Sequence, residues 1–254
     1  MIAVLRPALA LALLAALWQA VVWAAFVPER YFPPIATVVQ AGLSMIARGQ
    51  MQQTLFDTGS RAILGAVAVN LIGIGLGLAA TGAPSLRRIL DTVAAILQPV
   101  PPAAVVPMAV FALGLGWKLY AFVVVLVTIW PPYLATVSAL AATHPVLLSV
   151  GRMAGFGPLG LLWHIRLPAA MPEILAGVRY ATTIALIAVI VSEMITGRDG
   201  IGFLLFQKAF AIRIPEVFAL MFAVGLLGSA MGLAVNAVYR SVAGWHLAQR
   251  GRAA

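Results

Sequence analysis

The sequence offers few side chains that could do acid–base, nucleophilic or metal chemistry. It has seven acidic residues, no cysteine, and three histidines, His144, His164 and His246, which all fall in predicted loops or in the C-terminal tail. It contains neither a phosphate-binding loop of the G-x-x-x-x-G-K-[ST] type nor an H-E-x-x-H zinc motif. Thiol chemistry is therefore excluded, and we expect no catalytic residue, no metal site and no cofactor bound by this chain.

The composition is that of an integral membrane protein. Hydrophobic residues make up 63% of the 254 residues and charged residues only 9%, whereas a soluble domain has about 45–50% and about 25%. Intrinsic disorder is excluded too, because it requires low hydrophobicity and high charge. The net charge of +9 indicates basic residues that flank membrane spans and face lipid headgroups, so we expect no nucleic-acid partner.

Charge-poor apolar stretches of about 20 residues, the length that crosses a bilayer, predict an all-α polytopic protein forming one transmembrane domain over residues 1–254. With an even number of spans the two termini lie on the same side, and the Arg87–Arg88 pair and the basic tail favour the cytoplasm. The six predicted spans are 5–26, 60–80, 93–114, 119–141, 174–196 and 217–240.

Two connections and one glycine pattern carry further expectations. The segment 35–47 is amphipathic and is expected to lie on the membrane surface. The connection 197–216 contains Gly200 and Gly202 and predicts a folded external or re-entrant loop. Gly73 and Gly77, and likewise Gly228 and Gly232, have the G-x-x-x-G spacing that permits close helix approach. We expect this packing within the chain, and the alternative is a contact in a dimer.

Prolines open the third span, and irregular backbone at membrane depth is tolerated only inside protein or along a wet cavity. We interpret the segment as part of the translocation path or its gate, with the candidate residues Pro99, Pro101, Pro102 and Pro107. The alternative is a proline-rich surface loop that precedes a helix beginning later in the chain.

Glu193 and Arg179 are ionisable residues inside the fifth span. A charge inside a span is a functional candidate by default. Glu193 could line the path together with Gly200 and Gly202, or its carboxylate could accept hydrogen bonds from the backbone of the Gly197–Gly202 loop. Arg179 is expected to extend its side chain toward the cytoplasmic surface.

The segment 142–172 between the fourth and fifth spans predicts two short helices. Pro145 and Pro158 suit first helical turns, and Gly155-Phe156-Gly157 breaks the chain between them. Both helices are too apolar to stand unpartnered in the cytoplasm. A short apolar helix presented on a loop is suited to docking in a groove of a partner, and the alternative is a re-entrant hairpin that packs on its own protein.

Gly155 is followed after nine residues by Ile165-Arg166-Leu167-Pro168, the spacing G-x9-I-x-L-P, and the chain continues with Pro172, Gly177-Val178-Arg179, Ser192-Glu193-Met194 and Gly200-Ile201-Gly202. The first motif resembles the coupling loop of binding-protein-dependent ABC-importer permeases. The residues that follow resemble the nitrate/sulfonate/taurine branch of that family, and the similarity extends from Pro33 to Trp245. The acidic-Ala-Ala part of that motif falls on Ser149-Val150-Gly151, so its glutamate is absent. The residues assigned to the ATPase-coupling loop are Ser149, Arg152, Gly155, Phe156, Ile165, Arg166, Leu167 and Pro168.

The resemblance implies a multi-pass permease of the bacterial inner membrane that works only in a complex. Its partners would be a second permease copy, a pair of ATPase subunits that bind ATP and magnesium, and a periplasmic substrate-binding protein, all in membrane lipid. The implied cargo is a small anion or zwitterion such as nitrate, a sulfonate or taurine. The alternatives are a stand-alone secondary carrier or channel, and an intramembrane enzyme, for which no catalytic base is present. Secondary carriers usually show internal repeats, and the absence of a repeat from this sequence disfavours the carrier.

Overall fold

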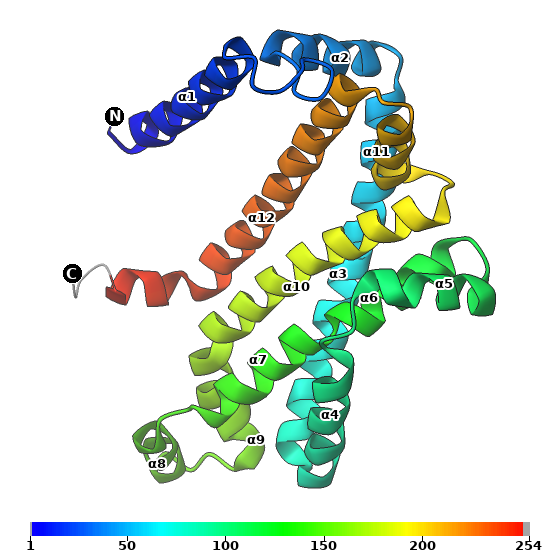
Figure 1. The fold of residues 1–254 in the computed structure, drawn as a ribbon. Coiled ribbons are helices and arrows are strands. Elements are labelled where there is room, and N and C mark those ends of the chain that lie inside the picture. The colour runs from blue at the N-terminus through cyan, green and yellow to red at the C-terminus, as the bar shows by residue number, and fades with distance from the viewer. Residues whose placement is uncertain (1, 251–254) are drawn as a thin grey trace.

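The computed structural model describes residues 2–250, with side-chain environments for residues 9–241, and every regular element in that part of the chain is helical (Figure 1). The elements are α1 (Ile2–Trp23), α2 (Ile35–Ala47), α3 (Gln50–Gly82), α4 (Pro84–Leu97), α5 (Pro102–Leu113), α6 (Trp117–Thr128), α7 (Trp130–Ala141), α8 (Pro145–Met153), α9 (Pro158–Leu161), the π-helical turn η1 (Leu162–Arg166), α10 (Leu167–Thr196), α11 (Gly200–Phe210) and α12 (Ile214–Arg250).

Four helices in the described part are long and apolar enough to cross a membrane. They are α3, the continuous α6–α7 pair, the run from α9 to α10, and α12. They correspond to four of the six predicted spans, and a fifth, 93–114, corresponds to α4 and α5. The first predicted span coincides with α1, whose part from Leu9 onward is a shorter apolar helix. The all-α membrane fold is thus confirmed, and the count of six spans stays a prediction.

The third predicted span differs from a simple helix because α4 and α5 are bent by 102°. The bend falls at Pro99–Pro102. Pro101 is extended, with φ −72° and ψ 140°, and Pro102 starts α5. Because proline lacks an amide hydrogen and restricts the residue before it, a cluster of prolines cannot continue a helix. The element is therefore a broken span or a re-entrant pair.

The centre of the fold is built from α3, α7 and α10, which pack on one another through small residues (Figure 1). A Cβ added at Gly73 would lie 2.6 Å from Pro132 Cγ, and one at Gly77 would lie 2.6 Å from Thr136 Cβ. On α10, a Cβ at Gly177 would lie 2.5 Å from Ala135 Cβ. These distances are too short for real contacts, so both helices approach α7 only because glycine stands there. The expected packing role is confirmed for Gly73 and Gly77, whereas a Cβ at Gly232 would meet nothing within 4 Å in the described structure.

Gly73→Ala is expected to destabilise the protein more than Gly75→Ala. The new Cβ at residue 73 would also meet the backbone oxygen of Ile129 at 2.8 Å, whereas residue 75 has open space around it. Forced separation of packed helices costs about 1–3 kcal/mol. Thermal unfolding in detergent, followed by tryptophan fluorescence, measures the difference, and equal melting temperatures for the two variants would contradict this account of the packing.

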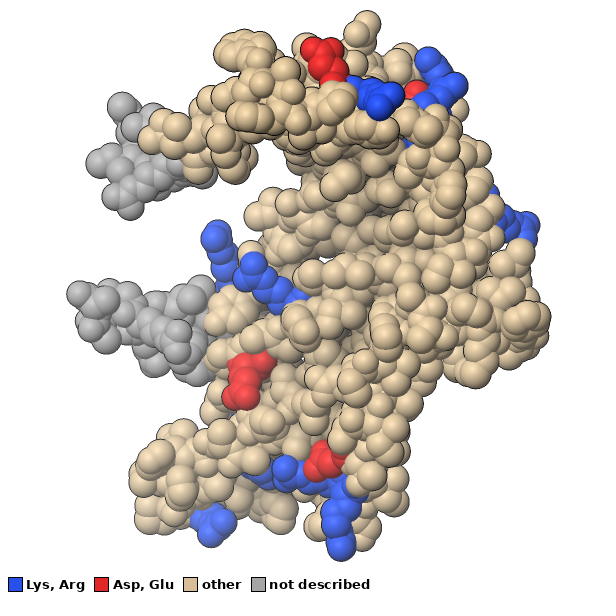
Figure 2. Space-filling view, in the orientation of Figure 1, with Lys and Arg blue, Asp and Glu red and all other residues tan. Residues whose placement is uncertain are grey.

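Opposite ends of the bundle carry different structures. The helices α2 and α11 lie at one end, and the short helices α8 and α9 lie at the other (Figure 1). The predicted amphipathic segment is the helix α2, and the predicted loop 197–216 contains the helix α11. Figure 2 shows that charged side chains gather toward these two ends, with a smaller group midway between them.

Candidate functional site: a buried polar network and an exposed coupling segment

Glu193 lies at the centre of a buried polar network where α3, α10 and α11 meet. Its side chain is fully buried. Arg61 donates to Glu193 Oε1 at 2.8 Å, and the hydroxyl of Thr58 donates to Oε2 at 2.8 Å. The amide of Gly202 donates to Oε2 at 3.0 Å. A carboxylate removed from water is stable only with such partners, and here two side chains of α3 and the start of α11 provide them.

Arg61 connects this carboxylate to a second one. Its guanidinium lies 2.9 Å from Asp199 Oδ1, and its Cζ lies over the Tyr120 ring, 4.4 Å from the centroid. The Tyr120 hydroxyl donates to Asp199 at 3.4 Å and is 3.2 Å from the hydroxyl of Thr196. Asp199 remains partly exposed, at 42% of its side chain. The network thus extends from the buried end of α10 to the surface and joins α3, α6, α10 and α11.

Glycines let the backbone at the start of α11 approach the Glu193 carboxylate closely. Gly197 ends α10 with φ +64°, and Gly200 has φ +86°, a region that other residues rarely adopt. A Cβ at Gly200 would collide with the Glu193 carboxylate, and one at Gly202 would collide with the backbone oxygen of Ile190. The carboxylate therefore accepts the Gly202 amide in the first turn of α11, while the Ile201 amide donates to the Thr58 hydroxyl at 2.8 Å.

The structure brings together three of the residues proposed from sequence, Glu193, Gly200 and Gly202. It confirms the interpretation in which the Glu193 carboxylate accepts hydrogen bonds from the loop backbone, while a role in the path stays a prediction. Sequence reasoning missed Arg61 and Thr58. One signal was available, because a glutamate inside an apolar span requires a cationic partner, and Arg61 stands at the start of another predicted span, 60–80.

The four candidate prolines lie elsewhere. Pro99 and Pro101 are in the bend before α5, Pro102 is its first residue, and Pro107 is inside it. No hydrogen bond or ion pair of the Glu193 network involves them in the described part of the chain. Their assignment to the path or gate stays a prediction that depends on the bend alone.

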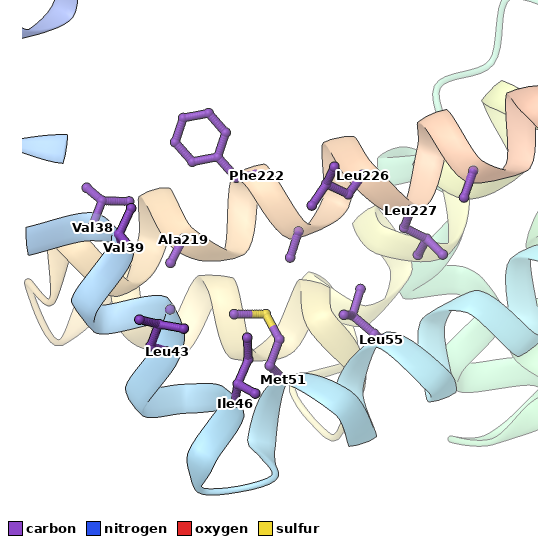
Figure 3. Close-up of a pocket in the computed structure, with 13 residues that line it drawn as sticks. Val38, Val39, Leu43, Ile46, Met51, Leu55, Ala219, Phe222, Leu226 and Leu227 are labelled. Atoms are coloured by element: carbon purple, nitrogen blue, oxygen red, sulfur yellow. The ribbon is translucent and has the colours of Figure 1, made fainter. Parts of the chain in front are cut away.

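Two cavities differ in what they could hold. A groove of about 560 Å³ between α2, the start of α3 and α12 is lined by 13 residues, none of them polar (Figure 3). It offers nothing that could orient a charged molecule. A smaller cavity of about 270 Å³ lies beside the network and is lined by polar and aromatic residues, including Arg61, Trp117, Tyr120, Arg198 and Asp199. Only the second has the mixed lining of a polar ligand site.

The segment between α7 and α10 forms the two short helices that its prolines and glycines predict. The helix α8 begins at Pro145 and α9 at Pro158. Gly155 has φ +84°, the left-handed conformation that ends a helix. Its amide donates to Arg152 O at 3.0 Å, and the next amide, of Phe156, donates to Gly151 O at 3.0 Å. Gly155 therefore permits the turn.

The rest of the segment divides into an anchoring part and an exposed part. Ile165 packs against Gly151 of α8, and the Phe156 ring stacks on His164 at 5.1 Å. Arg166, one of the residues assigned to the coupling loop, donates to Leu140 O at 2.9 Å and so holds the segment to the end of α7. Leu167 packs against the buried cluster at that end, and Pro168 lies in the first turn of α10.

Large apolar side chains of α8, α9 and η1 are nevertheless exposed. Ser149, which occupies the position of the missing glutamate, bonds only to Pro145 O at 3.2 Å in the described structure, and Arg152 is exposed. The described residues contain no cluster of three metal-ligating side chains. The segment is thus an apolar, protruding surface. Its exposed large hydrophobic residues are Val146, Leu147, Val150, Met153, Phe156, Leu159 and Trp163.

Comparisons with known proteins agree with this architecture. The chain is 26% identical over 241 residues to the taurine transport system permease protein TauC of Escherichia coli (strain K12), covering 93% of this chain and 88% of that protein. It is 26% identical over 234 residues to the nitrate import permease protein NrtB of Synechocystis sp. (strain ATCC 27184 / PCC 6803 / Kazusa), covering 89% and 84%.

The fold is similar to a chain of the MetNI methionine ABC transporter in an inward-facing conformation. The TM-score is 0.67 at 14% identity, over 77% of this chain and 97% of that one. The model of the family described as "Binding-protein-dependent transport system inner membrane component" matches residues 62–244. The chain therefore belongs to this family, and it is a multi-pass membrane transport subunit rather than an enzyme.

Proposed function

We propose that the chain is the permease subunit of an ATP-driven importer of a small anion or zwitterion, similar to nitrate, a sulfonate or taurine. The names of the relatives support this cargo class. In this proposal the segment 142–172 docks into a separate ATPase, which binds ATP and magnesium. A second permease copy completes the path, and a periplasmic binding protein delivers substrate at the end that carries α11.

The observation that carries the proposal is the exposed apolar surface of α8 and α9. Met153 is 81% exposed and Leu159 is 72% exposed. They belong to α8 and α9, which lie at the end of the bundle opposite α11 (Figure 1). Apolar side chains that protrude from a short helix suit a groove on a partner. The helix α12 begins at the end of the bundle that carries α11 and runs toward the end that carries α8 and α9 (Figure 1). If the ATPase docks on α8 and α9, this direction supports a cytoplasmic C-terminus.

Met153→Arg is expected to abolish co-purification of a P-loop ATPase with the tagged chain in mild detergent. An arginine would place an unpaired charge in the docked interface, which costs about 2–5 kcal/mol, or about thirtyfold to several thousandfold in affinity. Phe210→Arg is the matched control, because Phe210 is 74% exposed but lies at the end of α11. This variant should retain the ATPase.

Three outcomes would contradict the proposal. The first is a wild-type chain that retains no ATPase under conditions that preserve a control ABC transporter. The second is equal retention by Met153→Arg and wild type. The third is substrate uptake that continues after the ATPase is removed, which would instead support a stand-alone carrier or channel.

A further inference from the structure

Arg179 is a cation inside an apolar span, and in the described structure it has no carboxylate partner. All seven acidic residues of the chain lie in the part whose side chains are described. Four of them form ion pairs, with Arg61, Arg87, Lys208 and Arg213, and none of these pairs involves Arg179. The Arg179 side chain is exposed on α10. Its charge is therefore not neutralised within the described chain.

The depth of Arg179 follows from the helix geometry. It stands 14 residues from Glu193 and six from Glu173, which is ~21 Å and ~9 Å along a helix that rises 1.5 Å per residue. Glu193 belongs to the polar network at the α11 end of α10, and Glu173 lies close to the coupling segment. Arg179 thus stands inside the apolar run of α10, nearer the end that carries the coupling segment.

The exposed face of α10 around Arg179 differs from a lipid-facing surface. Exposed residues recur at helical spacing over Ala176, Arg179, Tyr180, Thr183 and Ile187, which places polar groups of three residues on one face. The exposed residues of α3 at comparable depth are all apolar: Ile63, Leu64, Val67, Leu71, Ile72, Gly75 and Ala79. Lipid suits an apolar face such as that of α3, but it would leave the Arg179 guanidinium and the Tyr180 hydroxyl unsatisfied, since of the three groups only the Thr183 hydroxyl is bonded in the described structure, to Arg179 O.

We propose that this face of α10, centred on Arg179 and Thr183, lines a water-filled path in which Arg179 is the fixed positive charge that favours an anion. The inference rests on the proposed function and deepens it by selecting an anionic or sulfonate-bearing substrate over a cation. A guanidinium matches the planar or trigonal oxygens of nitrate and sulfonate, because its donors form a fork. Water in the path would keep the charge solvated when no substrate is bound.

Glu173 is a negative charge that should oppose the attraction of an anion by Arg179. It lies on the same face of α10, nearer the coupling segment, and is exposed. It forms no ion pair with Arg179 in the described structure. Removing Glu173 should therefore strengthen the preference for an anion, whereas removing Arg179 should weaken it.

The absence of cysteine makes a substrate-independent test possible. Thr183→Cys places one thiol a helical turn from Arg179, whose backbone oxygen accepts the Thr183 hydroxyl at 3.1 Å. The complex, in native membrane vesicles, is treated with two methanethiosulfonates, one carrying a sulfonate and the other a trimethylammonium group. Each transfers its thioalkyl group to the thiolate and releases methanesulfinate, and mass spectrometry of the chain follows the rate.

We expect the thiol to react with both reagents in water. Arg179→Gln should lower the ratio of anionic to cationic reaction rates by about five- to tenfold, as expected for one charge some 6–8 Å away at a partly wet site. Arg179→Lys, which keeps the charge, should preserve the ratio. Glu173→Gln should raise it, and Arg88→Gln, which removes an exposed charge from α4, should leave it unchanged.

Ile72→Cys on the exposed apolar face of α3 and Ala185→Cys in the core are controls that should not react. An unreactive Thr183→Cys would overturn the inference, since the face would then be covered by lipid or by a second copy. A ratio that does not respond to Arg179→Gln would also overturn it, because the guanidinium would then lie at the membrane surface. ATPase co-purification with the Thr183→Cys chain reports separately on the proposed function.

Discussion

Replacing Arg61 with alanine is expected to cause the largest loss of stability among single side-chain deletions. The change leaves Glu193 fully buried without its cation, and it removes one partner of Asp199. Breaking one side of a buried pair costs about 3–5 kcal/mol. The thermal unfolding midpoint in detergent and the yield of inserted, monodisperse protein should both fall sharply.

Two comparisons make this result specific to the pair. In the double variant Arg61→Gln with Glu193→Gln neither charge is buried, so it should recover much of the loss. Arg87→Ala removes the exposed partner of Asp91, a pair 3.4 Å apart, and should cost no more than about 0.5 kcal/mol. A melting temperature for Arg61→Ala equal to that of Arg87→Ala would show that the network contributes little to stability.

Gly155→Val should abolish transport while the chain remains in the membrane. The residue at position 155 must adopt φ +84° between α8 and α9, which costs a β-branched residue about 1–3 kcal/mol. The turn would open and displace the exposed apolar side chains from the geometry that docks the ATPase. We expect at least a tenfold loss of binding-protein-stimulated ATP hydrolysis, measured on the reconstituted complex.

Gly157→Val is the matched control, because Gly157 lies two residues away with φ −71° and has open space where a side chain would begin. Valine can adopt that backbone, so this variant should retain most of the activity. Immunoblots of membranes confirm equal amounts of both variants. Equal activity of the two would remove the case for a specific turn in the coupling segment.

The sequence alone determined the features that depend on local chemistry. Apolar length predicts the positions of the spans, and the prolines at residues 145 and 158 together with Gly155 predict the two short coupling helices and the turn between them. These follow because each depends on a single segment of chain, where hydropathy, a missing amide hydrogen or a permitted positive φ acts without regard to the rest of the fold.

Only the tertiary structure decided the contacts that join distant segments. Arg61 and Glu193 are 132 residues apart, and nothing in either segment specifies which side chain the other will meet. The prolines determine where α4 and α5 break, but the angle of 102° between them and the exposed polar face of α10 depend on how the helices pack. A buried charge must find its partner in three dimensions, so composition can require that a partner exists, while packing alone determines which residue it is.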